Sequence, residues 1–168
     1  GDAASESLWI NDLTDSVEGL YAETENPAEP YDAVFGSVSM RREEAPEDGF
    51  GADYAGTAVI TRINYWPLEG FNCAYDWDAF DFQAFGNEPF WRARLAEGKV
   101  VLTTPEGEQT FEVDAHRWPL SNADKTFVLS ASDEECRDTM TGTFYGESVE
   151  LFVGESRWKG CGHWGLGK

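Results

Sequence analysis

The sequence lacks any long apolar run: no stretch approaches the roughly 20 residues that a transmembrane helix needs, so we expect no transmembrane segment. Basic residues are also scarce, with 12 Lys and Arg against 32 Asp and Glu, which gives a net charge of −20. Because phosphate binding needs clustered Lys and Arg, this charge excludes nucleic acid as a natural partner and disfavours anionic membranes. It suits a solvated acidic surface, which is the interpretation we favour, or a cationic partner.

Catalytic motifs are missing as well. The sequence contains no nucleophile elbow, no zinc-protease motif, no P-loop and no dinucleotide-binding glycine pattern. Its two histidines, His116 and His163, lie in a loop and in a glycine-rich C-terminal tail, where a surface or hydrogen-bonding role is expected. A Cys–His nucleophile pair stays open, although an exported chain would tend to oxidise its thiols. We therefore assign no catalytic residue and expect no cofactor and no enzyme activity.

Cysteine is limited to Cys73, Cys136 and Cys161, and no two of them form a CxxC pair. Zinc-ribbon and thioredoxin-like sites consequently have no support. One disulfide and one remaining thiol is the simplest arrangement for an exported protein. The count alone leaves all three pairings open.

Two acidic clusters invite a metal interpretation, namely Asp76, Asp78 and Asp81, and the run 132–135. In a strand, Asp76 and Asp78 would share a face and Asp81 would point away. Calcium needs six to eight oxygen ligands, and the pattern of an EF-hand loop is absent. We favour a solvated strand face over a weak calcium site, and we assign no metal ligand.

A chain of 168 residues is long enough for one well-cored domain, and its 41% hydrophobic and 14% aromatic residues indicate a globular protein. The charge is distributed unevenly along the chain and separates two regions. Residues 1–56 carry 14 acids and two bases, a net charge of −12, and residues 57–168 carry 18 acids and 10 bases, a net charge of −8. We expect an acidic N-terminal segment, 1–56, packed on or leading into a β domain, 57–168.

Within the N-terminal segment, apolar residues near helical spacing predict one short helix over residues 8–22. The composition of residues 25–30 predicts a linker, and residues 34–40 are a candidate strand. The acidic, Gly- and Pro-rich residues 43–56 predict a mobile loop.

From residue 57 onward the pattern becomes that of short strands every 8–12 residues, separated by Gly and Pro. This spacing is typical of a mostly β fold, a small antiparallel barrel or sandwich. The expected strands are residues 57–65, 79–85, 90–95, 99–103, 109–114 and 125–131, with two more in 143–153 divided by a bend at Gly146.

One motif carries more information than the rest, Gly86-Asn87-Glu88-Pro89-Phe90-Trp91. Gly and Asn tolerate a tight turn, and Pro stiffens the entry to the next strand. Phe90 and Trp91 would then place their rings on opposite faces of that strand. We expect a bend between two strands, closed by aromatic side chains, and a candidate pocket beside it.

Residues 84–91, which include this motif, resemble the signature of a family of uncharacterised bacterial exported proteins, many of them lipoproteins. The turn 104–107, the run 136–142, Tyr145 and residues 160–162 resemble the same family, so the likeness covers about half of the chain. The family's usual Cys-x-Asp-Gly-Met-Ser run is altered here by Thr139 and Thr141, so a different local turn is expected. Residues 1–56 share no part of the resemblance.

The resemblance implies export to the bacterial cell envelope, either in the periplasm or anchored by lipid, and a disulfide between Cys136 and Cys161. It supplies no catalytic residues. The polar start after Gly1 fits the mature part of a protein whose targeting segment has been removed.

Three functions compete. The first is a non-enzymatic envelope protein that serves as a binding or structural module. The second is an inhibitor of a cationic protein such as lysozyme, because an acidic surface accelerates association with a basic enzyme. The third is a carrier of a small ligand inside a β-barrel, with a pocket lined by some of the Trp residues. A filled interior would weigh against the carrier.

Overall fold

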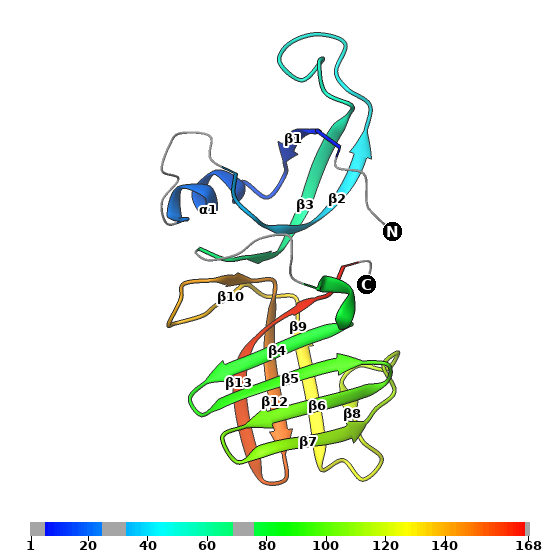
Figure 1. Cartoon of the computed structure of the whole chain (residues 1–168), viewed down its shortest axis with the longest axis vertical. Helices are drawn as coiled ribbons and strands as arrows, with labels where there is room; N and C mark the ends of the chain where they lie inside the picture. The colour runs from blue at the N-terminus through cyan, green and yellow to red at the C-terminus, as the bar shows by residue number, and fades with distance from the viewer. Residues whose placement is uncertain (1–5, 25–32, 69–75, 167–168) are drawn as a thin grey trace.

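The protein is built mostly from two β-sheets, which lie one above the other in Figure 1. A computed structural model describes residues 6–24, 33–68 and 76–166. A five-stranded sheet and one short helix form the upper part of the view, and an eight-stranded sheet forms the lower part. The predicted fold class, mostly β with a short N-terminal helix, is confirmed.

The eight-stranded sheet is antiparallel throughout and curls into a nearly closed barrel. Its strand order is β7-β6-β5-β4-β13-β12-β9-β8, so β13, near the end of the chain, pairs with β4. Across the open side, Phe111 of β7 stacks on Phe127 of β9 with ring centroids 4.5 Å apart. The strands are β4 (Phe82–Asn87), β5 (Phe90–Ala96), β6 (Lys99–Thr104), β7 (Gly107–Glu112), β8 (Leu120–Ser121), β9 (Phe127–Ser132), β12 (Glu147–Val153) and β13 (Ser156–Trp164).

Packed side chains fill the inside of this sheet. Residues alternate between the inner and outer faces, as in any strand, so the fully buried Trp91 of β5 is followed by buried residues at every second position. Burying an aromatic ring of this size removes roughly 150–250 Å² of surface from water. The fully buried large side chains inside this sheet are Phe82, Trp91, Leu95, Val100, Leu102, Leu120, Phe127, Leu129 and Leu151.

The five-stranded sheet is organised around one long strand, β3 (Thr57–Trp66). The antiparallel β2 (Ser37–Glu43) lies on one edge of β3, and the parallel β1 (Trp9–Asp12) lies on the other. On that second edge β3 also pairs with β11 (Phe144–Tyr145), which pairs in turn with β10 (Cys136–Arg137). The acidic N-terminal segment therefore shares a hydrogen-bonded sheet with the first strand of region 57–168.

The N-terminal helix is shorter than predicted. Residues 8–22 were expected to be helical, but residues 9–12 form β1 and the helix α1 spans Val17–Glu23. Asp12 explains where the strand gives way to the helix, because its carboxylate accepts hydrogen bonds from the backbone N–H groups of Ser16 (3.0 Å) and Val17 (2.9 Å). It thus satisfies donors that a helix start leaves free. The buried Leu20 then packs α1 onto β3.

The predicted glycine-rich tail is a second error, because residues 156–164 form β13 in the middle of the barrel. Glycines normally weaken strands, but two of these meet a crowded surface. A Cβ on Gly160 would lie 2.0 Å from the backbone oxygen of Phe85, and one on Gly162 would lie 2.6 Å from the Phe82 ring. Here glycine permits close approach of neighbouring chains.

One polar network joins the two sheets through Arg62 of β3. Its Nη2 donates to the carboxylate Oε1 of Glu147 on β12 and to the backbone oxygen of Gly146, each at 2.7 Å. Its Nε donates to Asp133 at 2.9 Å. Trp164 Nε1 adds a hydrogen bond of 3.2 Å to the same oxygen of Glu147, whose side chain is only 9% exposed. One oxygen of this nearly buried carboxylate therefore accepts hydrogen bonds from both Arg62 and Trp164 at the junction.

Candidate functional site

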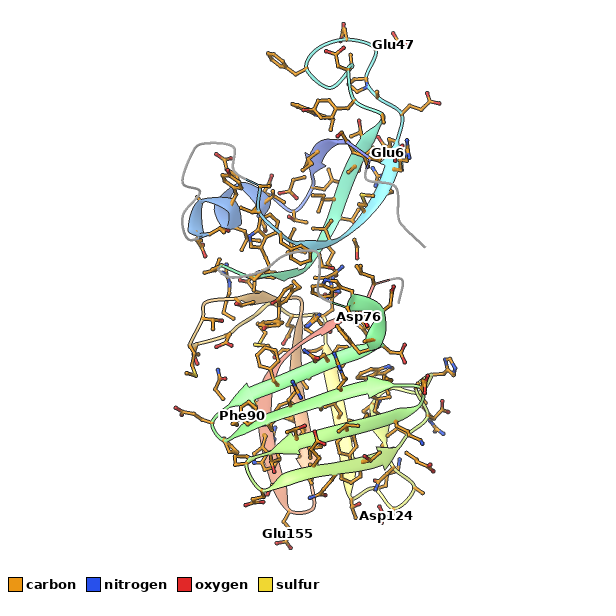
Figure 2. The ribbon with its side chains drawn as sticks, in the orientation of Figure 1. Glu6, Glu47, Asp76, Phe90, Asp124 and Glu155 are labelled. Carbon is orange, nitrogen blue, oxygen red and sulfur yellow. A yellow bond between two sulfur atoms is a disulfide. The ribbon has the colours of Figure 1, made fainter. Side chains whose placement is uncertain are left out.

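The first half of the motif, residues 86–88, and the two predicted disulfide cysteines line one open cleft of ≈ 320 Å³, whereas residues 89–91 of the motif do not line it. Residues 85–88 at the end of the β4–β5 hairpin form one wall, and residues 136–139 form the opposite wall. The floor comes from residues 159–161 of β13 and from Ser148. Figure 2 shows Phe90 at the outer end of this hairpin. The cleft thus lies where both sheets meet.

A disulfide closes one side of the cleft. Cys136 and Cys161 are bonded, with an S–S distance of 2.04 Å and Cα atoms 5.4 Å apart. This confirms the pairing implied by the resemblance. Because β10 belongs to the five-stranded sheet and β13 to the eight-stranded sheet, the bond ties the sheets together. Cys73 and the linker at 25–30 lie outside the described residues.

Asp138 links the two walls of the cleft by hydrogen bonds. Its Oδ1 accepts from the side-chain amide of Asn87 at 2.9 Å and from the backbone N–H of Met140 at 2.7 Å. Its backbone N–H donates to Thr143 at 3.0 Å, which closes the loop after β10. Asp138 is 9% exposed, so most of its carboxylate is turned inward. The Asn of the motif therefore serves to hold the hairpin against this loop.

Gly86 of the motif is required because there is no room for a side chain, and not because the backbone is left-handed. A Cβ on Gly86 would lie 2.3 Å from Trp91 Nε1, and a Cβ on Gly160 would lie 2.8 Å from the same indole ring. Trp91 itself is 0% exposed. Phe90 is 50% exposed, so of the two motif aromatics only Trp91 belongs to the core. The backbone at Gly86 and Gly160 therefore packs directly against the Trp91 ring.

Gly160→Ala is expected to lower the free energy of unfolding by about 2 kcal/mol or more, because an added methyl must push β13 away from β4. Urea unfolding followed by tryptophan fluorescence measures the loss. Gly19→Ala is the matched control: nothing lies within 4 Å of its Cβ position in α1, and alanine there is expected to stabilise the helix by up to about 1 kcal/mol. Equal stability of the Gly160 variant and the wild type would contradict the crowding argument.

His163 is sealed at the junction of the sheets, in contrast to its expected place in a tail. It is 3% exposed, and its Nδ1 lies 3.3 Å from the Trp164 carbonyl oxygen. Rings surround it, with centroids 4.8 to 5.7 Å away, from Tyr65, Trp77, Phe80 and Tyr145. Burial lowers the pKa of His163 from 6.5 to about 4. The imidazole is consequently neutral at pH 7.

Stability is expected to fall by about 2 kcal/mol between pH 7 and pH 5 because of His163. The unfolded imidazole takes up a proton near pH 6.5, whereas the folded one stays neutral down to about pH 4. The contribution of the neutral His163 to folding stability is thus complete above pH 6.5 and is lost as the pH falls toward 4. Urea unfolding at pH 7, 6 and 5 should show that the free energy of unfolding depends less on pH for His163→Gln than for the wild type. If the free energy of unfolding depends on pH in the same way for wild type and His163→Gln, the pH dependence does not come from His163.

The remaining candidate residues are dispersed. His116 is exposed on the loop after β7, where its backbone N–H bonds to Asp114. Asp76 and Asp78 lie at the start of a short 3-10 helix, η1 (Trp77–Ala79), not in a strand. Asp133, in the second acidic cluster, pairs with Arg62. Within residues 6–24, 33–68 and 76–166, no group of three or more His, Cys, Asp or Glu side chains could hold a metal ion.

No family model, curated protein or solved structure matches the chain. In the part of the chain that the structure describes, no helix is long and apolar enough to cross a membrane. The site must therefore be interpreted from its own geometry. Two cysteines and the Asn87–Asp138 hydrogen bond clamp the cleft, and these groups are engaged in holding the sheets together.

Sequence reasoning missed the contacts that build this junction. Asn87 and Asp138 are 51 positions apart, and Arg62 and Glu147 are 85 apart. No local pattern marks such partners. Arg62 offered one weak signal, as the one charged residue of strand β3.

Proposed function

We propose that this chain is a non-enzymatic binding module of the bacterial cell envelope and that its partner is a cationic protein. The observation that carries the proposal is the net charge of −20. Figure 2 shows Glu47 at the tip of the upper loop and Asp124 and Glu155 in turns at the opposite end. A field of this sign steers a basic protein toward the molecule and repels an acidic one.

Polar groups at the cleft support binding or structure rather than catalysis. The Asp138 carboxylate is taken up by hydrogen bonds from Asn87 and the backbone, and two of the three cysteines are oxidised. His163, neutral and enclosed by rings, faces the interior. The barrel interior is packed with side chains such as Trp91 and Phe127, so the proposal rests on the outer surface and not on a carried ligand.

Placement in the cell envelope is supported by the disulfide, because such bonds are typical of oxidising compartments. The resemblance of residues 84–91 and 136–142 to exported bacterial proteins adds to this support. An inhibitor of a basic enzyme such as lysozyme is a more specific form of the same proposal.

Calorimetric titration with lysozyme tests the proposal. At about 50 mM NaCl we expect a saturable one-to-one complex, which weakens at about 150 mM because salt screens the attraction. A neutral protein of similar size, titrated in parallel, should give no heat of binding. Absence of saturable binding at the lower salt concentration would overturn the proposal. Lytic activity that is unchanged by a molar excess of the chain would exclude the inhibitor form.

A further inference from the structure

The β2–β3 loop, residues 44–56, extends from the end of the molecule opposite the barrel (Figure 1). Its Phe50 is 88% exposed, the largest exposed fraction among the large hydrophobic side chains that the structure describes. Exposed apolar side chains also gather on this part of the chain. Of those described, six of ten lie within residues 9–54, namely Trp9, Ile10, Leu13, Met40, Phe50 and Tyr54. Two of them, Phe50 and Tyr54, belong to the loop itself, and Trp9 contacts the Tyr54 ring.

The loop is built by specific contacts. The backbone N–H of Ala52 bonds to Gly49 and that of Tyr54 to Gly51, each at 3.2 Å. The Tyr54 ring meets Trp9 of β1 edge-on, with centroids 5.6 Å apart. Gly51 leaves no room for a side chain, because a Cβ there would lie 2.8 Å from Pro46. Phe50 is therefore presented by a loop that these contacts hold in one shape, in contrast to the mobile loop expected from composition, and this reduces the entropy lost when a partner binds.

Charge selects the kind of partner. The loop carries four exposed acids and no base, which are Glu44, Glu47, Asp48 and Asp53. None of these four takes part in an ion pair with another described residue. A second copy of the chain would present the same negative loop and would be repelled. An anionic membrane would repel the loop as well. A basic protein surface remains the complementary occupant.

We propose that the β2–β3 loop is the docking surface for the cationic partner, with Phe50 inserted into an apolar pocket that Lys and Arg side chains surround. This inference rests on the proposed function and names the surface that performs it. Aromatic side chains buried at the centre of an interface supply most of its binding energy. The surrounding carboxylates, which include Glu47 and Asp48, supply long-range attraction and fast association.

The test compares variants of the full chain in binding to lysozyme, measured by surface plasmon resonance at about 50 and 150 mM NaCl. Phe50→Ala is expected to weaken binding about thirtyfold, mainly through faster dissociation. The double variant Glu47→Gln/Asp48→Asn should slow association and flatten its salt dependence. Phe152→Ala, at a side chain 36% exposed on β12, is the matched control and should bind like the wild type. Circular dichroism verifies that each variant is folded.

The outcomes separate the inference from the proposed function. If wild type and Phe50→Ala bind lysozyme equally, the loop is not the docking surface, although the binding module stands. If the wild type does not bind, the proposed function itself fails. Sedimentation that shows dimers lost on Phe50→Ala would assign the loop to self-association and overturn the inference. Binding of the wild type, but not Phe50→Ala, to phosphatidylglycerol vesicles would overturn it as well.

Discussion

Arg62→Met is expected to lower the free energy of unfolding by about 3 kcal/mol, because it leaves the nearly buried carboxylate of Glu147 without its cation. The side chain of Glu147 is 9% exposed, and that of Arg62 is 26% exposed. The partial exposure of Arg62 places the effect at the lower end of the range for buried pairs. Methionine keeps most of the apolar stem, so lost packing contributes little. Urea unfolding gives the difference.

Two controls isolate the charge. Arg157→Met removes the cation of an exposed pair with Glu150 and should cost less than about 1 kcal/mol. The double variant Arg62→Met/Glu147→Gln should regain part of the lost stability, since the only carboxylate then without Arg62 is that of Asp133, which is 80% exposed, and Gln still accepts from Trp164. If the two Arg→Met variants lose equal stability, burial of Glu147 is not the cause.

The strands that alternate locally could be predicted from sequence. Residues 90–95 and 99–103 were expected to be strands, and the structure has β5 at Phe90–Ala96 and β6 at Lys99–Thr104. The expected bend at Gly146 separates β11 from β12. In these segments the residues that face inward occupy every second position, so the pattern and the burial agree.

Elements defined by distant partners could not be predicted in this way. Strand β1 exists because it pairs with β3, about 48 positions away, and nothing in residues 9–12 alone separates it from a helix. Strand β13 was hidden by Gly160 and Gly162, whose small size is required by Phe85 and Phe82 on β4. Local propensity leaves β1 undecided and argues against β13, and pairing with distant strands decides both.

The cleft, too, could be predicted only in part from the sequence. The composition of the motif indicated a bend, and a bend joins β4 to β5. The role of Asn87 depends on Asp138, and the disulfide pairing was implied by the resemblance and not by spacing. The exposure of Phe50 had no signature in sequence, because an aromatic residue in a loop is as compatible with a covered position as with an open one.

Replacing both bonded cysteines by serine is expected to lower the free energy of unfolding by about 3 kcal/mol, the second large effect. The bond closes a loop between positions 25 apart and so restricts the unfolded chain. It also joins β10 of one sheet to β13 of the other, so its loss should loosen the junction. Urea unfolding of wild type and Cys136→Ser/Cys161→Ser measures the change.

Reductant supplies the control for this prediction. Wild type should lose similar stability in dithiothreitol, and the double variant should not respond. Non-reducing mass spectrometry of the wild type should give one peptide pair, that of Cys136 with Cys161, and a bridge from Cys73 to either partner would refute the assignment. The contacts that hold the β2–β3 loop come from the loop itself, from Trp9 of β1, and from Ser7 and Arg42, which both bond to Ala55. None of these residues lines the cleft that the disulfide closes. The folded double variant should therefore bind lysozyme as tightly as the wild type, which would separate the clamp that stabilises the fold from the surface that binds.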